Sequence, residues 1–339
     1  MKIPSKSLLR SGKDRLLASD WWLASMNQRA RSIASVPVDE SCKSDPSKQE
    51  ENEWKNPDGA SDPKAYVRYL DGIFEGMSSS GPVVDYKCTV YERMDIRAGD
   101  SIADIGCGTG ADVLALAELL SAETKKTTDG VWGKILGVDI SDTMVREARD
   151  KVSKSRWETS EKKVEISFHT GNAQKLGDRI PSNSFDICRS DRSLQHMPDP
   201  QAAVEEMVRI SKPGIGRIVI SEPDWETLVL DSPSHTRVTR KIVNHFTDTR
   251  VNGWMGRQLS RIMKTAGLVD VTILPMTCPV TELGFVRGAY LDKARKIAVE
   301  ASVVTDQEAS DWMEELVALN KNDQFFSTLT IYIARGNKR

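Results

Sequence analysis

Histidine and cysteine are scarce in this sequence, which holds four histidines and five cysteines among 339 residues. The cysteines are odd in number and widely scattered, and no Cys-x-x-Cys or Cys/His spacing joins them. This pattern argues against a disulfide framework and a structural zinc site. No run of about 18 apolar residues occurs, so a transmembrane helix is excluded. The formal net charge of −2 argues against a dedicated nucleic-acid binder. These absences favour a globular protein of a reducing, cytoplasmic compartment.

The N-terminal region changes in texture twice before a regular pattern begins. Residues 1–38 hold seven basic and two acidic residues and are rich in serine. This composition is typical of an organelle import signal, and an ordinary solvated helix is the simpler alternative. Residues 38–63 hold eight acids, three bases and three prolines, which indicates a linker. We therefore expect residues 1–61 to form a partly disordered extension.

Strand and helix patterns alternate through the rest of the chain. Two helices are predicted at 64–77 and 84–95, so that 62–98 forms an N-terminal helical segment and 99–339 the main domain. The predicted strands cover residues 101–104, 134–139, 164–168, 185–189, 216–221, 269–276 and 326–334, and further helices cover 111–120, 256–266, 288–303 and 306–320. This βα alternation predicts an α/β fold whose parallel sheet is covered by helices on both faces.

A strand that ends in a glycine-rich loop is the sharpest signal in the chain. Residues 102–110 read Ile-Ala-Asp-Ile-Gly-Cys-Gly-Thr-Gly and pass into a predicted helix. Gly106, Gly108 and Gly110 permit a tight turn and let backbone N–H groups approach a ligand without an intervening Cβ atom. The loop predicts a nucleotide site, with a plain tight turn as the alternative.

The next predicted strand ends in Asp139, and a carboxylate at that place in a doubly wound sheet can accept both ribose hydroxyls of a nucleoside. Capping of the following helix is the alternative, although Ser141 can already cap it. The spacing Gly-x-Gly-x-Gly argues against NAD, and so does Asp104, whose charge a pyrophosphate would not tolerate. A ligand with ammonium and sulfonium groups would be attracted to that acid. The pattern therefore points to S-adenosylmethionine.

Further motifs follow in a consistent order. They are Gly171-Asn172-Ala173 after the third strand, residues 185–191 as the fourth strand and its exit, Leu194-Gln195-His196-Met197-Pro198-Asp199-Pro200, and Lys212-Pro213-Gly214. With the glycine loop and Val138-Asp139, they resemble the motifs of class I S-adenosylmethionine-dependent methyltransferases, specifically the small-molecule enzymes akin to the ubiquinone/menaquinone C-methyltransferases. The resemblance covers about residues 99–277 and the final strand. It implies a Rossmann-like, mostly parallel seven-stranded sheet whose last strand is antiparallel, a lid helix at 65–77 and a helical cap at 278–325.

The resemblance also assigns residues to the cofactor S-adenosyl-L-methionine. The loop glycines pack against its methionine moiety, Asp139 binds the ribose, and Asn172 with the backbone N–H of Ala173 reaches the adenine. Asn172 stands where many members have aspartate, and its amide can still pair with the adenine edge. Asp104 either meets the ammonium group or holds the glycine loop in place. The full set is Asp104, Gly106, Gly108, Gly110, Asp139, Ile140, Met144, Asn172, Ala173, Ser190 and Asp191.

Polar residues after the fourth and fifth strands are candidates for catalysis and substrate binding, because the cleft of such a sheet opens there. His196 is a candidate general base, and a structural role in its loop is the alternative. Arg192 either neutralises an acidic substrate group or pairs with Asp191 or Asp224. Trp225 stacks on a ring, faces the sulfonium or is a buried aromatic of the lid. Two tyrosines of the first helix close over the cofactor or pack in the core. The substrate-binding candidates are Tyr66, Tyr69, Glu222 and Trp225.

The predicted function is methyl transfer to a small or medium organic metabolite at O, N or C, with no metal site. Methylation of RNA or protein is disfavoured by the near-neutral charge and by Ser-Asp-Arg-Ser at 190–193, which is no Asn-Pro-Pro-Tyr-like motif. A cofactor-binding cyclase, isomerase or regulatory module is a third hypothesis. Neither nucleic acid nor a membrane is an expected partner, and the existence of a homodimer stays open.

Overall fold

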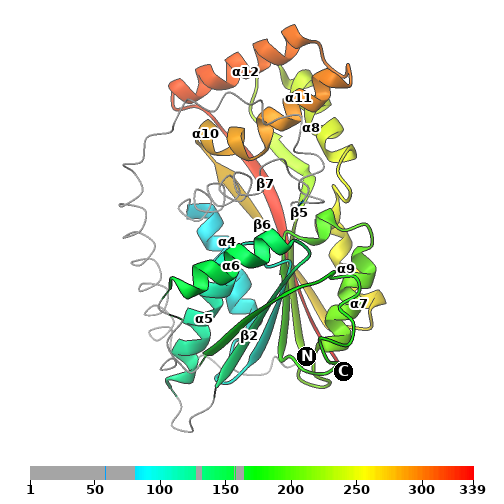
Figure 1. Cartoon of the computed structure of the whole chain (residues 1–339). Helices are drawn as coiled ribbons and strands as arrows, with labels where there is room; N and C mark the ends of the chain where they lie inside the picture. Colours follow the sequence, from blue (N-terminus) through cyan, green and yellow to red (C-terminus); the bar gives the residue numbers. More distant parts are fainter. Residues whose placement is uncertain (1–57, 59–80, 127–131, 156, 158–163) are drawn as a thin grey trace, which may run out of the picture.

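The computed structural model describes residue 58 and residues 81–126, 132–155, 157 and 164–339. In this part of the chain, a seven-stranded sheet forms the centre of the molecule (Figure 1). The expected helix at 64–77, with Tyr66 and Tyr69, and nearly all of the 1–61 extension lie outside the described residues.

The sheet has the strand order β3-β2-β1-β4-β5-β7-β6. The strands span Ser101–Ile105 (β1), Gly133–Asp139 (β2), Val164–Thr170 (β3), Ile187–Asp191 (β4), Arg217–Leu230 (β5), Val269–Val280 (β6) and Ser327–Asn337 (β7). Strands β1 to β5 run parallel to one another, and β7 lies antiparallel between β5 and β6. The predicted doubly wound, mostly parallel sheet with an antiparallel last strand is confirmed.

Helices cover both faces of the sheet. On one face, α7 (Pro200–Ile210) and α9 (Met255–Thr265) bury their apolar residues against the strands. On the other face, α4 (Gly81–Met94) and α5 (Ala111–Thr124) do the same. Helix α6 (Asp142–Ser153) packs on β2 and β3. The strand order reverses between β1 and β4, and ligands bind at the carboxyl ends of the strands at such a point in sheets of this kind.

The sequence supplies caps where the helices begin. The hydroxyl of Ser141 accepts a hydrogen bond from the backbone N–H of Met144 at the start of α6. The carboxylate of Asp199 accepts one from Ala202 at the start of α7, and Pro200 occupies the first turn of that helix. Caps of this kind stabilise a helix by roughly 1 kcal/mol each. The local sequence therefore determines the residues at which α6 and α7 begin.

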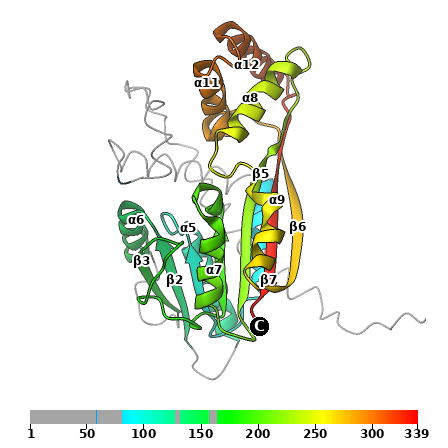
Figure 2. The same cartoon turned by 90° about the vertical axis from the view of Figure 1, so that its right-hand side faces the viewer.

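A cap of helices stands beyond the carboxyl ends of the parallel strands (Figure 1 and Figure 2). It begins where β5 outruns its neighbour, because β5 pairs with β4 only as far as Ser221 and continues beside β7 to Leu230. The cap helices pack around a core of their own that includes Phe246 and Trp312. They are α8 (Thr236–Asp248), α10 (Leu283–Val286), the π-helical turn η6 (Arg287–Leu291), α11 (Asp292–Glu300) and α12 (Asp306–Lys321).

The elements of the cap differ from the sequence prediction in three ways. The strand predicted at 216–221 continues to Leu230, because its pairing with β7 persists that far. Beyond Ser221 the edge that faced β4 is unpaired, so Pro223, which has no N–H, is tolerated there. Helix α8 was not predicted, although its buried residues recur at helical spacing. The helix predicted at 288–303 begins at residue 283, contains a π-turn and ends at residue 300.

None of the helices in the described part of the chain is both long and apolar enough to cross a membrane. Cys88, Cys107, Cys188 and Cys278 carry free thiols. Burial raises the pKa of Cys188 to about 12, so this thiol stays protonated at neutral pH.

Trp312 is fully buried in the cap, and its Nε1 donates a hydrogen bond to the hydroxyl of Thr239 over 2.8 Å. We expect Trp312→Ala to lower the free energy of unfolding by about 3–5 kcal/mol, because it leaves a cavity and an unpaired hydroxyl. Urea denaturation followed by circular dichroism measures the loss. Glu314→Ala, on the exposed side of the same helix, should change stability by less than about 0.5 kcal/mol. A loss for Trp312→Ala no larger than this control would contradict the prediction.

Candidate functional site

The glycine loop joins β1 to α5 at the carboxyl edge of the sheet. Gly106 has a positive φ of 80°, and a Cβ atom there would lie 2.2 Å from the hydroxyl oxygen of Ser193. The loop that follows β4 therefore packs so closely on Gly106 that a larger residue would displace it. Gly108 also has a positive φ, of 53°, but no described atom lies within 4 Å of the position a Cβ would take. The glycine loop thus presents bare backbone to a ligand.

Asp139, at the end of β2, is bonded to the glycine loop. Its Oδ2 accepts a hydrogen bond from the N–H of Gly108 over 2.9 Å, and its Oδ1 accepts one from the N–H of Ser141 over 3.0 Å. Burial raises the pKa of Asp139, although these backbone donors act in the opposite direction. A carboxylate has about four acceptor positions, so Asp139 keeps capacity for further donors. The carboxylate therefore holds the loop and can also accept ligand hydroxyls.

Asp58 reaches the start of α6 from the N-terminal part of the chain. Its carboxylate accepts hydrogen bonds from the hydroxyl of Ser141 over 2.8 Å and from the N–H groups of Asp142 and Thr143, both over 2.9 Å. Partial burial raises the pKa of Asp58, but these bonds outweigh that effect and lower it overall. The charge of Asp58 in turn raises the pKa of Asp139. Asp58 is therefore an additional cap of α6, close to the candidate ribose ligand.

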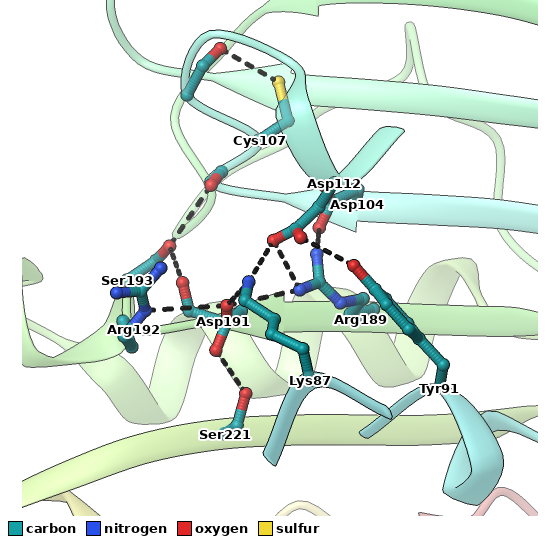
Figure 3. A network of polar contacts seen from close by, with 12 residues as sticks. Lys87, Tyr91, Asp104, Cys107, Asp112, Arg189, Asp191, Arg192, Ser193 and Ser221 are labelled. Carbon is teal, nitrogen blue, oxygen red and sulfur yellow. Dashed lines mark hydrogen bonds and ion pairs between the residues drawn. The ribbon is translucent and has the colours of Figure 1, made fainter. Parts of the chain in front are cut away.

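A buried arginine joins three carboxylates beneath the glycine loop (Figure 3). Arg189 of β4 donates hydrogen bonds to Oδ1 of Asp104 and to Oδ2 of Asp112, both over 2.7 Å. Its guanidinium also lies 3.3 Å from Oδ2 of Asp191. The side chains of Arg189 and Asp104 are each 1% exposed. Together with Lys87, these four residues form what we call the ionic cluster.

Helix α4 completes the ionic cluster from the opposite side. The ammonium group of Lys87 pairs with Asp112 over 2.6 Å and also with Asp191. Tyr91 donates its hydroxyl to Oδ1 of Asp112 over 2.7 Å, and Tyr86 donates to Oδ2 of Asp191 over 3.4 Å. Polar side chains thus tie α4 to the start of α5 and to the end of β4 (Figure 3).

The cations of the ionic cluster control the ionisation of its carboxylates. Burial raises the pKa of Asp104 to about 6, even though Arg189 acts in the opposite direction. Burial also raises the pKa of Asp191, but the surrounding cations, Lys87 above all, lower it to about 2. The pKa of Asp112 is lowered well below its ordinary value by Arg189 and Lys87, against the effect of burial. At pH 7 and above, all three carboxylates are therefore mainly ionised.

Glu222, on β5, holds the loop that follows β4. It is fully buried, and its Oε1 accepts a hydrogen bond from the N–H of Leu194 over 2.6 Å. Burial raises the pKa of this carboxyl group to about 8, so it is mainly protonated at neutral pH. Oε2 of Glu222 and the hydroxyl oxygen of Ser190 are buried with no hydrogen-bond partner among the described residues. The structure thus shows Glu222 in contact with the backbone of the loop after β4, and a role in substrate binding stays a prediction.

Trp225 lies further along β5, where the sheet meets the cap. Its Nε1 donates a hydrogen bond to Oε1 of Gln195 over 2.7 Å. Its ring meets Phe246 and Tyr290 edge to face, with centroid distances of 5.3 and 5.4 Å. The side chain is fixed on two sides, by the loop after β4 and by the cap helices.

His196 ends the short 3₁₀ turn η5 (Leu194–His196). Burial, assisted by the positive charges of Arg250, Lys293 and Arg192, lowers its pKa to about 3. The imidazole is therefore neutral at physiological pH, and it is a weak base in this surrounding.

Arg192, just beyond β4, has a positive φ of 56°, which is a strained conformation for a residue with a side chain. Its backbone N–H donates to the carbonyl of Ser221 over 2.7 Å, and its Nε lies 3.5 Å from Oδ2 of Asp191. Asp224, the other partner considered for Arg192, instead pairs with Arg257, 2.9 Å from its carboxylate. The backbone bond to β5 and the ion pair hold the strained residue in place.

The remaining predicted cofactor residues lie around the ends of β2 and β3. Asn172 is exposed, and its Oδ1 accepts a hydrogen bond from the N–H of Gln174 over 2.9 Å. Ile140 is 57% exposed, whereas Met144 and Ala173 are buried. An exposed isoleucine directly after the candidate ribose ligand offers an apolar surface for a flat ring.

Sequence reasoning missed several charged residues of the site. Arg189 could have been found, because an arginine inside an apolar strand requires carboxylates nearby. Asp112, in the first turn after the glycine loop, is a natural partner for it. Lys87 and Arg250 carry no local signal, since neither belongs to a recognisable motif.

The strand order with an antiparallel β7, the glycine loop after β1 and the acid that ends β2 together define a class I methyltransferase fold. A family model described as "Methyltransferase domain" matches residues 96–267. The chain therefore belongs to the S-adenosyl-L-methionine-dependent methyltransferases, and S-adenosyl-L-methionine is its methyl donor.

Individual relatives agree with this family. The "Uncharacterized 37.1 kDa protein in transposon TN4556" of Streptomyces fradiae is 31% identical over 269 residues, which are 79% of this chain and 70% of the relative. The demethylmenaquinone methyltransferase of Shouchella clausii is 34% identical over 137 residues, 40% of this chain and 51% of that enzyme. The match thus spans about half of the enzyme's length.

A solved structure shows the same fold. Phosphoethanolamine N-methyltransferase 2 of Haemonchus contortus has a TM-score of 0.50 and 18% identity, over 84% of this chain and 60% of that chain. At this identity the likeness concerns the fold alone.

We expect Arg189→Met to lower the free energy of unfolding by about 3–5 kcal/mol at pH 8, because buried carboxylates would lose their cation. Without the guanidinium, the pKa of Asp104 rises above about 6. A carboxyl group with a raised folded pKa contributes stability below its unfolded pKa and loses it as the pH rises through the folded value. The loss should therefore shrink toward pH 5. Urea denaturation at both pH values measures it.

Arg146→Met is the matched control, because Arg146 is 67% exposed and its pair with Asp142 contributes less than about 0.5 kcal/mol. A loss in Arg189→Met that is as small as in this control, or equal at both pH values, would contradict the assigned role of Arg189.

Proposed function

We propose that the protein transfers the methyl group of S-adenosyl-L-methionine to a small or medium organic molecule at an O, N or C atom. The observation that carries the proposal is the junction of the glycine loop and Asp139 at the open edge of the sheet, with the cap beyond it. The net charge of −2 supports a small acceptor, because an RNA acceptor would require a basic surface. The name of the Shouchella clausii relative, a methyltransferase of demethylmenaquinone, points in the same direction.

The residues of the site fit the cofactor. When bound, S-adenosyl-L-methionine supplies the electrophilic methyl group and the leaving group. Asp139 would hold the ribose hydroxyls with its remaining lone pairs, and the bare backbone at Gly108 leaves room for the ligand. Oδ2 of Asp104 is buried, and no described residue donates a hydrogen bond to it. An ammonium group or a water molecule would satisfy this oxygen.

The chain itself contributes orientation and the exclusion of water. Holding the two reactants in line can lower the barrier by roughly 7–11 kcal/mol. Trp225, fixed by Gln195 and by two aromatic rings, provides a rigid wall for the acceptor. His196 can accept a hydrogen bond from the acceptor, but with a pKa of about 3 it removes a proton poorly unless a ligand raises that pKa. Arg192 and Glu222 remain candidates for contact with the acceptor.

Methyl-labelled S-adenosyl-L-methionine tests the acceptor class directly. The purified protein is incubated with the labelled cofactor and, in separate reactions, with a small-metabolite extract, total RNA and mixed protein. We expect label in the small-metabolite fraction. Label only in RNA or protein would overturn the acceptor class. Binding of the cofactor by calorimetry without transfer to any fraction would instead indicate a cyclase, isomerase or regulatory role.

We expect Asp139→Ala and Asp139→Asn to weaken the binding of S-adenosylhomocysteine by about 100-fold or more, because two hydrogen bonds to a charged group are lost or impaired. Titration calorimetry measures the affinity, and thermal unfolding verifies that the variants fold. The asparagine variant retains an oxygen for Gly108. Asp150→Ala, on the exposed far turn of α6, should bind as the wild type does. Unchanged affinity in a folded Asp139 variant would rule out the ribose assignment.

A further inference from the structure

Arg250 is a half-buried cation at the boundary between the cap and the loop after β4. It follows α8, and its guanidinium stacks on the rings of Trp225 and Phe246, 4.0 and 4.2 Å from their centroids. Its Nε is buried without a hydrogen-bond partner in the described part of the chain. Burial is the only influence on its ionisation, and it lowers the pKa to about 9. Arg250 is therefore mainly protonated at neutral pH, with no described carboxylate to balance its charge.

The two arginines that are buried among the described residues are paired with acids. Arg189 pairs with Asp104 over 2.7 Å, and Arg217 pairs with Asp100 over 2.8 Å. A buried charge costs several kcal/mol when it lacks a counter-ion, and stacking on aromatic rings returns only about 2 kcal/mol. The pairing of Arg189 and Arg217 shows how this fold treats a structural arginine. Arg250 is half-buried, its Nε is buried, and no described acid pairs with it, so its charge is available to an anionic ligand.

Two further cations, Lys293 on α11 and Arg192, act together with Arg250 on the neutral ring of His196. The three cations come from three separate segments of the chain. Arg192 already shares the carboxylate of Asp191. The cation without a described acid partner is Arg250, on the side of the cap.

This region adjoins the candidate cofactor edge. Gln195, the neighbour of His196, is bonded to Trp225, on which Arg250 stacks. The same loop follows β4, whose last residues are the candidate cofactor contacts Ser190 and Asp191. A ligand group at Arg250 would therefore be separated from the cofactor edge by a single loop, which suits a methyl acceptor.

We infer that Arg250, together with Lys293 and the neutral His196, binds an anionic group of the methyl acceptor, a carboxylate or a phosphate. The inference rests on the proposed function. A guanidinium donates two parallel N–H bonds to either group, and a neutral imidazole adds one donor. The bound anion replaces the missing counter-ion of Arg250. It also raises the pKa of His196, because a nearby negative charge favours the imidazolium, and so makes His196 a better base.

The test uses the whole chain, without cofactor or acceptor. Inorganic phosphate and acetate are titrated in parallel at constant ionic strength and neutral pH. The ring resonances of the histidines report binding by NMR, since the sequence holds only four, and His196→Gln assigns the signal of His196. We expect at least one anion to shift that signal saturably, and the tighter of the two names the group. Failure of both anions to shift it would overturn the inference.

Variants decide whether Arg250 is the binding group. Arg250→Met should weaken the anion at least about tenfold. Arg240→Met, which removes an exposed arginine from α8, should leave binding unchanged. Equal anion affinity in Arg250→Met and the wild type would overturn the inference. Where circular dichroism shows that Arg250→Met does not fold, Arg250→Lys and Lys293→Met make the same comparison. No methyl transfer is needed, so failure here is distinguishable from failure of the proposed function.

Discussion

The arrangement of the site depends on one buried ion, Arg189. A guanidinium at 1% exposure inside a sheet requires carboxylates within reach, and β1, α5 and β4 each supply one. Asp104, Asp112 and Asp191 supply the negative charges that balance it, so β1, α5 and β4 are fixed to a common centre. Lys87 brings α4 to the same centre. The ionic cluster therefore fixes β1 and α5, the two elements that the glycine loop joins, to β4 and α4.

A second constraint is the unequal length of neighbouring strands. Strand β5 loses β4 as a partner after Ser221 but continues beside β7, so it carries its later residues past the edge where the parallel strands end. Glu222 on this extension holds the loop after β4, and Trp225 contacts both that loop and the cap helices. Because one strand carries both residues, the loop and the cap are positioned together relative to the cofactor edge. A rigid strand gives this positioning more precision than a loop would.

Features that act through the local backbone were predictable from the sequence, and features that act through distant charges were not. The glycine loop and Asp139 were located correctly at the ends of β1 and β2, because a turn that needs glycine and an acid that ends a strand leave local patterns. The partner of Arg189 depends on which strands lie side by side, and Asp104 is 85 residues away in sequence. Arg250 lies in a segment for which no element was predicted, and its stacking on Trp225 exists only in the folded chain. The sequence therefore predicted the fold and the position of the glycine loop, but it did not predict the long-range contacts of Arg189 and Arg250.

The distribution of charge bears on the kind of acceptor. The carboxylates gather at the candidate cofactor edge, where Oδ2 of Asp104 has no donor among the described residues. The uncompensated cation, Arg250, lies on the side of the cap. Transfer of a methyl group from a sulfonium to a neutral amine moves positive charge toward the acceptor, which Arg250 and Lys293 would oppose. Transfer to an anionic oxygen or carbon instead cancels charge, and an anionic group elsewhere on the acceptor would offset the cations. On the inferred arrangement, the field of the site thus favours an acceptor that enters with negative charge over one that gains positive charge.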